Sequence, residues 1–201
     1  MFQTCKKGAL EYLTADSLEG SVHCFSTRLG GVSTGVLESL NLGVHRGDAP
    51  ENVLENYRIL GEAVGFSPRQ TVFPMQRHTA RIRRVGRENC GEGLWRDVPE
   101  VCDGLITNEP GVALCCFSAD CTPILLYDPE KQAIAAVHAG WRGTAQGIAA
   151  QAVHYTHCIC GGNVTTGDHT SHSDADYTAW NGTDSITYTN NVAYVYLTGD
   201  A

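Results

Sequence analysis

Two short apolar segments of this chain carry metal-binding residue types at matching ends. Cys121 precedes the apolar run 124–127, and His138 follows the run 134–137. The Asp-Pro-Glu-Lys turn between the runs would place both side chains at one end of a hairpin. His78 ends another extended segment upstream. One thiolate and two imidazoles suit zinc and leave a fourth position for water, so these residues predict an open, catalytic metal centre.

Two kinds of chemistry are open to this set of side chains. With zinc bound, Cys121 is deprotonated, and the pKa of a water in the open position falls to roughly 7, which makes hydroxide a nucleophile. Without metal, His138 would activate Cys121 for acyl transfer, provided that the two side chains lie within hydrogen-bond distance. Asp120, next to Cys121, is a candidate for orienting a ligand or handling a proton. We expect Cys115 and Cys116 to be buried hydrophobic residues, the more frequent role of a cysteine in a strand.

A second group of metal-binding residue types lies nearer the end of the chain. It comprises His154, His157, Cys158, Cys160, His169 and His172. The first members fall at the end of a predicted helix, and the segment that follows has the composition of a loop. We therefore predict weak surface binding of metal here rather than a dedicated site.

The apolar pattern predicts the elements that position the centre. A helix is expected over 49–64, with Asp48 as its N-cap, Pro50 in the first turn and Gly65 at its end. A second helix is expected to open at 143–144, with Ala145, Ile148, Ala149, Ala152 and Val153 on one face. Strands are predicted at 22–26, 71–73, 82–85, 103–107, 112–117, 124–127 and 134–137. The apolar runs at 112–117, 124–127 and 134–137 read as strands buried on both faces. The fold class predicted is α/β, an α+β layered sandwich in which helices flank a mixed sheet.

Composition restricts the function further. The chain has 201 residues and a net charge of −8, which argues against sequence-independent binding of nucleic acid. There is no apolar run long enough to cross a membrane and no secretory signal, and nine cysteines without a disulfide pattern indicate reduced thiols in the cytoplasm. Five arginines between Arg77 and Arg87 are expected to form a solvated strand face, the alternative being a site for an anion such as phosphate.

The C-terminal segment differs in composition from the rest of the chain. No lysine or arginine follows Arg142, and the region from residue 163 is rich in Thr, Asp, Asn, Gly and Tyr. We therefore predict a core domain over 1–157 and an atypical tail over 158–201. Residues 165–176 read as loop or disordered chain, and 186–188 with 192–197 as a hairpin around an Asn-rich turn.

Several motifs resemble one known family. They are Thr-Arg-Leu-Gly-Gly-Val-Ser at 27–33, Leu-Asn-Leu-Gly at 40–43, Gly-Asp at 47–48, Gln-x-His at 76–78, Asp-Gly-Leu-Ile-Thr-Asn at 103–108, Ala-Asp-Cys-x-Pro-Ile at 119–124 and Val-His-Ala-Gly-Trp-Arg-Gly at 137–143. These resemble the YfiH-type family, also called the laccase-domain, polyphenol oxidase or purine nucleoside phosphorylase family. The match covers residues 22–152, whereas the chain after about 158 departs from the family pattern.

The resemblance implies a layered α/β fold and a zinc site formed by the family's His, Cys, His set, which corresponds to His78, Cys121 and His138. It implies phosphorolysis of adenosine, inosine, guanosine or methylthioadenosine, and deamination of adenosine. The expected partners are then a purine nucleoside and phosphate, with no nucleic acid and no membrane. Arg28 and Arg142 are candidates for holding phosphate, and Asn41 and Gln76 for contacting substrate.

The resemblance also raises other activities. A single copper bound in place of zinc would account for the oxidase label, because copper(II) outcompetes zinc at many such sites. Other members are linked to editing of a peptidoglycan precursor, which would suit a metal-free Cys121–His138 hydrolase. The departure after residue 158 leaves a third reading, an inactive remnant. Oligomeric state is not predicted.

Overall fold

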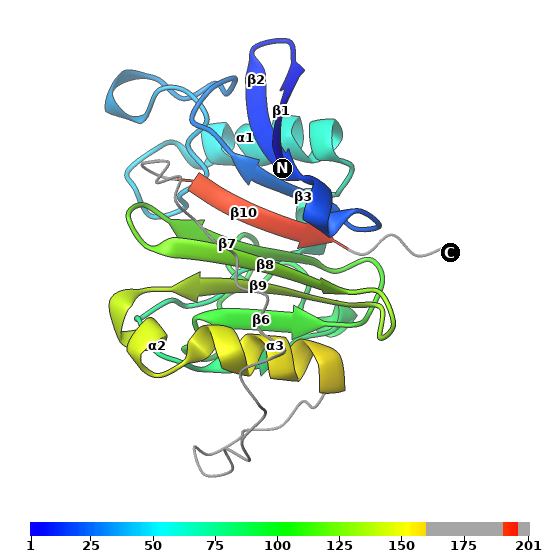
Figure 1. The fold of residues 1–201 in the computed structure, drawn as a ribbon. Coiled ribbons are helices and arrows are strands. Elements are labelled where there is room, and N and C mark those ends of the chain that lie inside the picture. Colours follow the sequence, from blue (N-terminus) through cyan, green and yellow to red (C-terminus); the bar gives the residue numbers. More distant parts are fainter. Residues whose placement is uncertain (160–190, 197–201) are drawn as a thin grey trace.

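Two sheets form the centre of the fold. The structure, a computed structural model, describes residues 1–159 and 191–196 (Figure 1). The first sheet has the order β1-β2-β3-β10-β7-β4 and comprises β1 Phe2–Lys7, β2 Leu10–Ala15, β3 Val22–Ser26, β4 Thr71–Val72, β7 Ala113–Ser118 and β10 Asn191–Tyr196. The second has the order β5-β6-β9-β8 and comprises β5 Ile82–Arg84, β6 Gly104–Thr107, β8 Thr122–Asp128 and β9 Ala133–Ala139. The helices are α1 Pro50–Val64, α2 Trp141–Ala145 and α3 Ile148–Cys158.

The strands divide their side chains between three apolar layers because successive residues of a strand point to opposite faces. In β7, Leu114 and Cys116 pack between the sheets, whereas Ala113 and Cys115 pack toward α1. In β9, alternate residues likewise join the layer between the sheets or the layer beneath α3. The order of layers is therefore helix, sheet, sheet, helix, which confirms the predicted layered sandwich, with two mixed sheets in place of one.

Helix α1 begins and ends close to the predicted positions. Val53, Tyr57 and Leu60 are buried against the first sheet, and the Tyr57 hydroxyl donates to the carbonyl oxygen of Leu42 at 2.8 Å. Gly65 ends the helix with a left-handed backbone (φ 108°), as a C-terminal glycine is expected to do. Asp48 is not the N-cap, because that position belongs to Ala49, whose amide nitrogen donates to the Asp48 carboxylate.

The second predicted helix is divided in two. Gly147 has a left-handed backbone (φ 74°) between α2 and α3, and this break changes which residues face the sheet. Ile148 and Ala152 are buried as predicted, together with Thr156, but Ala145, Ala149 and Val153 are exposed. The predicted common face of five residues is wrong because it assumed one uninterrupted helix.

Two strands differ from expectation. Strand β8 lies at the edge of the second sheet and buries only Leu125 among its residues, so the prediction that it is buried on both faces is wrong. Strand β10 pairs antiparallel with β3 on one side and β7 on the other, near the middle of the first sheet (Figure 1). The predicted strand at 192–197 thus forms, whereas its proposed hairpin partner at 186–188 and the predicted loop at 165–176 lie outside the described residues. A segment beyond residue 157 contributes to the same sheet as the core, and the division at 157 remains a prediction.

None of the helices in residues 1–159 and 191–196 is both long and apolar enough to span a lipid bilayer.

Candidate metal centre

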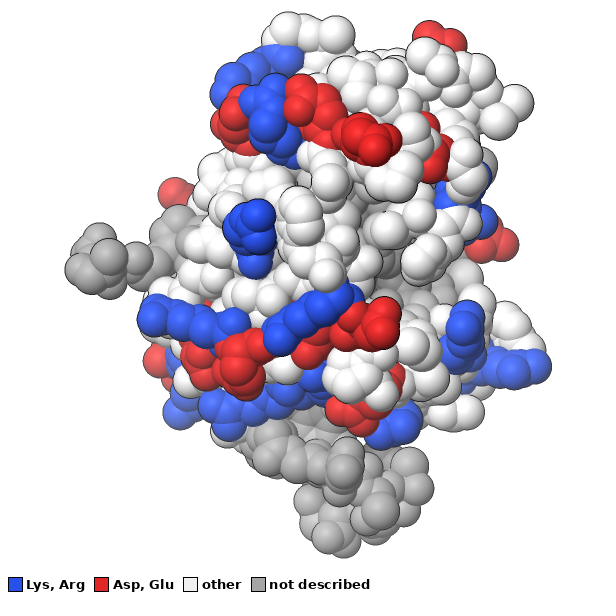
Figure 2. Space-filling view, turned by 180° about the vertical axis from the view of Figure 1, so that it is seen from behind, with Lys and Arg blue, Asp and Glu red and all other residues white. Residues whose placement is uncertain are grey.

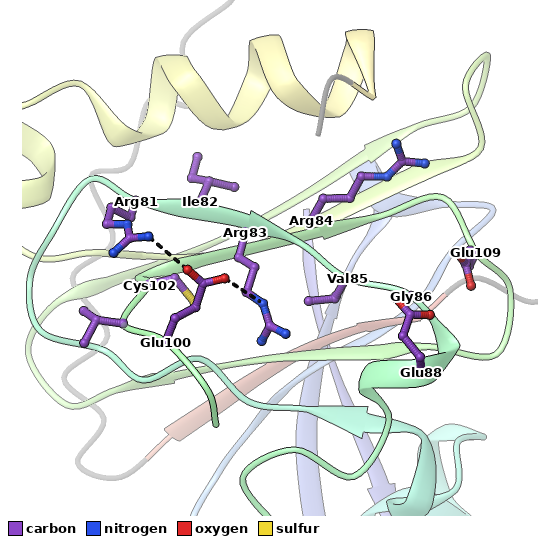
Figure 3. A pocket seen from close by; sticks show the side chains of 11 residues that line it. Arg81, Ile82, Arg83, Arg84, Val85, Gly86, Glu88, Glu100, Cys102 and Glu109 are labelled. Carbon is purple, nitrogen blue, oxygen red and sulfur yellow. Dashed lines mark hydrogen bonds and ion pairs between the residues drawn. The ribbon is translucent and has the colours of Figure 1, made fainter. Parts of the chain in front are cut away.

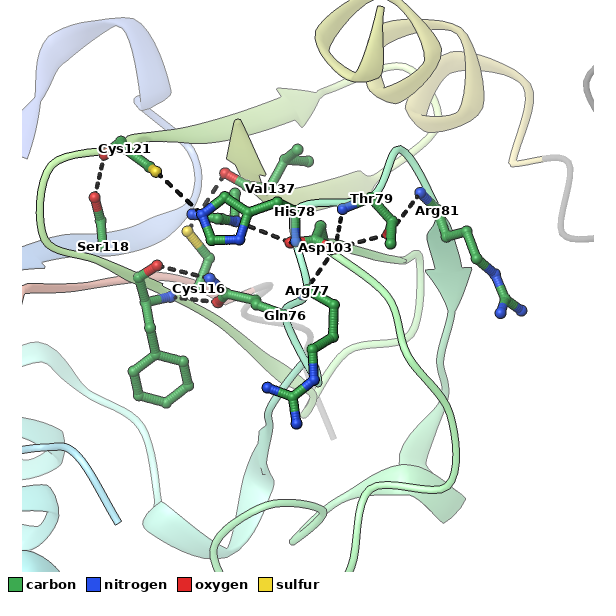
Figure 4. Close-up of polar contacts among 12 residues, drawn as sticks. Gln76, Arg77, His78, Thr79, Arg81, Asp103, Cys116, Ser118, Cys121 and Val137 are labelled. Atoms are coloured by element: carbon green, nitrogen blue, oxygen red, sulfur yellow. Dashed lines mark hydrogen bonds and ion pairs between the residues drawn. The ribbon is translucent and has the colours of Figure 1, made fainter. Parts of the chain in front are cut away.

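His78, Cys121 and His138 meet at one end of the two sheets. His78 lies in the connection between β4 and β5, Cys121 lies in the turn between β7 and β8, and His138 is near the end of β9. One donor atom from each residue lies within 4.8 Å of those of the other two. The Cys121 Sγ is 3.6 Å from Nε2 of His78, and the two imidazole rings stand at 80° to each other (Figure 4).

The three side chains differ in their access to solvent. His138 is 4% exposed, Cys121 is partly buried and His78 is exposed. The Ser118 hydroxyl donates to the carbonyl oxygen of Cys121, which fixes the turn that presents the thiol. A metal held here would therefore have protein on one side and an open side toward solvent, where a small molecule can approach.

The rival group near the end of the chain does not form a comparable site in the part of the chain that the structure describes. The His78 group is the set of three metal-binding side chains found within residues 1–159 and 191–196. His157 instead bonds the Asp128 carboxylate through Nδ1 at 2.8 Å. Cys160, His169 and His172 lie outside the described residues.

Asp103 lies behind the two histidines and is fully buried. It immediately precedes β6, where the register places its neighbour Gly104 opposite Val137 and therefore brings Asp103 beside His138. Its Oδ1 is 2.9 Å from Nδ1 of His138, and its two oxygens also accept hydrogen bonds from the segment that carries His78 (Figure 4). Burial raises the pKa of this carboxyl, but the hydrogen bonds from His138 and Thr79 outweigh burial and lower the pKa to about 2.

Sequence reasoning missed Asp103 as part of the centre. The residue stands in the Asp-Gly-Leu-Ile-Thr-Asn motif, but no role was assigned to it. A signal was present, because Asp103 directly precedes the short, mostly apolar segment 104–107, and a carboxylate buried beside such a strand needs hydrogen-bond donors. The partner strand β9 carries His138 one residue before its end.

Asp120, the acidic residue that the sequence did single out, is exposed beside the thiol. Its Oδ1 lies 3.7 Å from Sγ of Cys121. Burial raises the pKa of the Cys121 thiol, and the negative charge of Asp120 raises it further. The protein alone thus disfavours a free thiolate at this position, and a bound cation would favour it.

The backbone closes tightly over the two imidazoles at Gly140. A side-chain carbon at this position would contact Cδ2 of His78 and lie 3.1 Å from Cε1 of His138. The next residue, Trp141, is 71% exposed, and the Arg142 guanidinium lies 4.9 Å from the centre of its ring. An aromatic surface and a cation therefore directly follow Gly140 in the chain.

The remaining predicted substrate residues differ in their availability. Arg28 is exposed. Gln76 exchanges two hydrogen bonds of 2.8 Å with the backbone of Phe117, which joins the His78 segment to β7. Asn41 is buried and bonds the Asp48 carboxylate at 2.9 Å and the amide of Gly43 at 3.0 Å. The amides of Gln76 and Asn41 are thus occupied within the protein, and their contact with substrate remains a prediction.

Three of the five clustered arginines, Arg81, Arg83 and Arg84, line a separate pocket of about 440 Å³ along β5, which shares no lining residue with the centre (Figure 3). Arg83 pairs with the buried Glu92 at 2.5 Å, and Arg81 pairs with Glu100 at 2.9 Å. Acidic residues thus compensate these cations, and Figure 2 shows Lys and Arg interspersed with Asp and Glu across one face of the molecule. The balance of charge gives this pocket no preference for anions.

The fold is a layered α/β sandwich, and the His78–Cys121–His138 group could hold a metal ion at one end of its two sheets. The family model described as multi-copper polyphenol oxidoreductase laccase matches residues 22–166. The chain belongs to this laccase-domain family, which confirms the resemblance read from its motifs.

Named relatives and solved structures agree with the family. The chain is 38% identical to a purine nucleoside phosphorylase of Bacteroides thetaiotaomicron over 143 residues, 70% of this chain and 53% of the relative. It is 41% identical to purine nucleoside phosphorylase YlmD of Geobacillus stearothermophilus over 142 residues, 69% of this chain and 52% of the relative. The crystal structure of that YlmD superposes with a TM-score of 0.70 at 35% identity, covering 79% of this chain and 60% of the other. The chain thus spans about half the length of the curated relatives it matches.

Proposed function

We propose that this chain carries the site of a zinc-dependent purine nucleoside enzyme. The observation that carries the proposal is the convergence of His78, Cys121 and His138 from three separate segments, in a chain whose relatives are named purine nucleoside phosphorylases. The donor set fits zinc because it combines one sulfur with two imidazole nitrogens. The orientation of the His138 ring also suits a bound metal, because Nδ1 faces a carboxylate and Nε2 is left for the metal.

The proposed reaction is phosphorolysis of adenosine, inosine, guanosine or methylthioadenosine, with deamination of adenosine as a second activity. A bound zinc ion would supply Lewis-acid activation of the attacking water or phosphate. Trp141 offers an exposed aromatic face on which a purine can stack, and Arg142 and Arg28 offer cations for phosphate. Asp120, beside the thiol, is proposed to handle a proton. Copper in place of zinc is consistent with the same donors, and the described residues supply one such group rather than the several that a multicopper oxidase needs.

The geometry favours this proposal over a metal-free Cys–His hydrolase. That alternative requires His138 to activate Cys121, but the imidazole in contact with the thiol is His78, at 3.6 Å between Sγ and Nε2. His138 directs its Nδ1 to Asp103. Three donor atoms within 4.8 Å of one another favour a ligand set over a nucleophile with its base, which needs only two side chains.

The test compares metal content and nucleoside turnover in the wild-type protein and two cysteine variants. Cys121→Ser removes the proposed ligand, whereas Cys5→Ser alters a partly buried cysteine in the β1–β2 hairpin. We expect about one zinc per chain and phosphate-dependent release of purine base in the wild type and in Cys5→Ser, with loss of both in Cys121→Ser. Zinc retained in Cys121→Ser would refute the ligand set. Zinc bound without turnover of any purine nucleoside would refute the proposed activity, and the interpretation of the chain as an inactive remnant would then remain.

A further inference from the structure

The fully buried carboxylate of Asp103 bonds both segments that supply the histidines of the centre (Figure 4). Oδ1 accepts from the backbone N–H of His78 at 2.9 Å and lies 2.9 Å from Nδ1 of His138. Oδ2 accepts from the backbone N–H groups of Arg77 and Thr79, at 3.2 and 2.7 Å, and from the Thr79 hydroxyl at 2.7 Å. Five donors thus saturate one side chain, since a carboxylate offers about four lone-pair sites.

The hydrogen bonds between Asp103 and the segment that carries His78 stabilise an unusual backbone conformation. His78 has φ 59°, in the left-handed region that residues other than glycine rarely occupy. Such a conformation persists only where the surroundings enforce it. Here three consecutive N–H groups, those of Arg77, His78 and Thr79, point at one carboxylate, which turns the His78 side chain outward to the Cys121 thiol.

The contact with His138 determines which ring nitrogen carries the proton. Both oxygens of Asp103 already accept backbone N–H groups, as an ionised carboxylate does, and a carboxylate has no proton to donate. Nδ1 of His138 is therefore the donor in this contact. A neutral imidazole protonated on Nδ1 has its lone pair on Nε2, the form that can bind a metal.

We infer that Asp103 is the positioning residue of the metal centre, because its one carboxylate holds His78 in a left-handed conformation and keeps Nε2 of His138 free for the metal. The inference rests on the metal-binding part of the proposed function. It assigns to Asp103 neither metal nor substrate, and it holds whichever nucleoside is used.

The substitution Asp103→Asn tests this role because it preserves shape and removes one acceptor. If the amide NH₂ takes the place of Oδ2, it meets the N–H groups of Arg77 and Thr79, donor against donor. If it takes the place of Oδ1, it meets the His78 N–H and requires His138 to be protonated on Nε2, which blocks the metal. Either orientation disturbs a ligand, so affinity should fall by about 10- to 100-fold, the usual effect of losing the group that orients a metal-bound histidine.

Asp128 provides a matched control. Its carboxylate also accepts two backbone N–H groups, those of Glu130 and Lys131, and bonds Nδ1 of His157 at 2.8 Å. It lies at the far end of β8 from Cys121, about 20 Å along the strand at about 3.3 Å per residue. Asp128→Asn therefore loses the same kinds of hydrogen bond away from the centre.

The experiment measures Co²⁺ and Zn²⁺ affinity by chelator competition, with the thiolate–Co²⁺ absorption as a second readout, and the His138 tautomer by ¹⁵N NMR of the metal-free protein. We expect Asp103→Asn to bind both ions at least 10-fold more weakly, with Asp128→Asn unchanged. His138 should become protonated on Nε2 if the amide NH₂ occupies the Oδ1 position, and should keep its proton on Nδ1 if the NH₂ occupies the Oδ2 position. Thr79→Val removes one hydrogen-bond donor and keeps the carboxylate, so it should show a smaller loss of metal affinity. This variant replaces Asp103→Asn in the test if Asp103→Asn does not fold.

Three results would overturn the inference: unchanged affinity in Asp103→Asn and Thr79→Val, an equal loss in Asp128→Asn, or a His138 protonated on Nε2 in the metal-free wild type. If the wild type bound neither ion, the zinc-dependent function would fail. The tautomer, read without metal, would still decide whether Asp103 fixes the proton of His138.

Discussion

Replacing Gly140 by alanine should strongly weaken metal binding while leaving the fold intact. Its backbone (φ −72°, ψ 167°) is extended and acceptable to alanine, so the substitution imposes no conformational strain. The new methyl group would instead contact Cδ2 of His78 and approach Cε1 of His138. To restore a normal carbon–carbon separation of about 3.5 Å, the His78 ring has to move by about 1 Å. Metal–ligand bonds tolerate displacements of only about 0.2 Å.

One of three protein ligands is therefore lost, and we expect zinc affinity to fall by about 100-fold or more, equivalent to about 2.7 kcal/mol. Affinity is measured by chelator competition, and the free energy of unfolding by urea titration of the metal-free protein. Gly65→Ala is the control, because Gly65 has φ 108° with open space around it. That change should cost about 1 kcal/mol of stability and leave zinc affinity unchanged. Unchanged zinc affinity in Gly140→Ala would show that the imidazoles are not held where the structure places them.

Three further outcomes are expected. Trp141→Leu should raise the KM for purine nucleosides by about 10-fold, because stacking contributes about 1–3 kcal/mol. Trp95→Leu, which also has an arginine over its ring, should not, and equal effects would refute stacking at Trp141. Asn56→Ala should lower the free energy of unfolding by about 2–4 kcal/mol, because it removes hydrogen bonds to the Val32 N–H, the Ser33 hydroxyl and the Asn41 carbonyl oxygen. A urea midpoint near that of the wild type would contradict this. Asp48 has its pKa lowered to about 2 by hydrogen bonds from Ser33 and Asn41, so the stability it adds is complete above about pH 4 and disappears as pH falls toward 2. The difference in unfolding free energy between wild type and Asp48→Asn, about 1 kcal/mol at pH 7, should shrink in that range, and a constant difference would refute it.

The sequence was sufficient for much of the fold because its strongest patterns are local. Continuous apolar runs predicted β7 and β9 as strands buried on both faces, and their residues do alternate between two apolar layers. The proline at the start and the glycine at the end of α1 fixed the bounds of that helix. The local pattern of apolar residues does not indicate which strands or helices lie beside an element in the fold. Strand β8 has a continuous apolar run, as β9 does, but it lies at a sheet edge, and the one residue within β8 that points to an edge is Pro123 near its start.

The candidate site was predictable in its chemistry and less so in its supports. His78, Cys121 and His138 were recognisable because their types form a ligand set, and the structure brings them together. Asp103 escaped notice because its importance comes from the register of β6 with β9 and from hydrogen bonds donated by backbone N–H groups. Such groups are common to nearly all residues, so the sequence does not mark them. Gln76 and Asn41 were singled out as polar residues in specific motifs, whereas their amides are bonded to the protein's own backbone and side chains.

The position of β10 has a consequence for how the protein folds. In the first sheet Phe25 pairs with Ala193, and Ala193 also pairs with Cys116, so residues near the two ends of the chain meet in one sheet. Contacts of such long sequence separation form slowly, because a large loop has to close before they contribute. Until residues 191–196 leave the ribosome, β3 and β7 each present an unpaired edge to other chains. Synthesis of residues 191–196 thus fills the gap between β3 and β7, and a nascent chain without them exposes edges that favour aggregation.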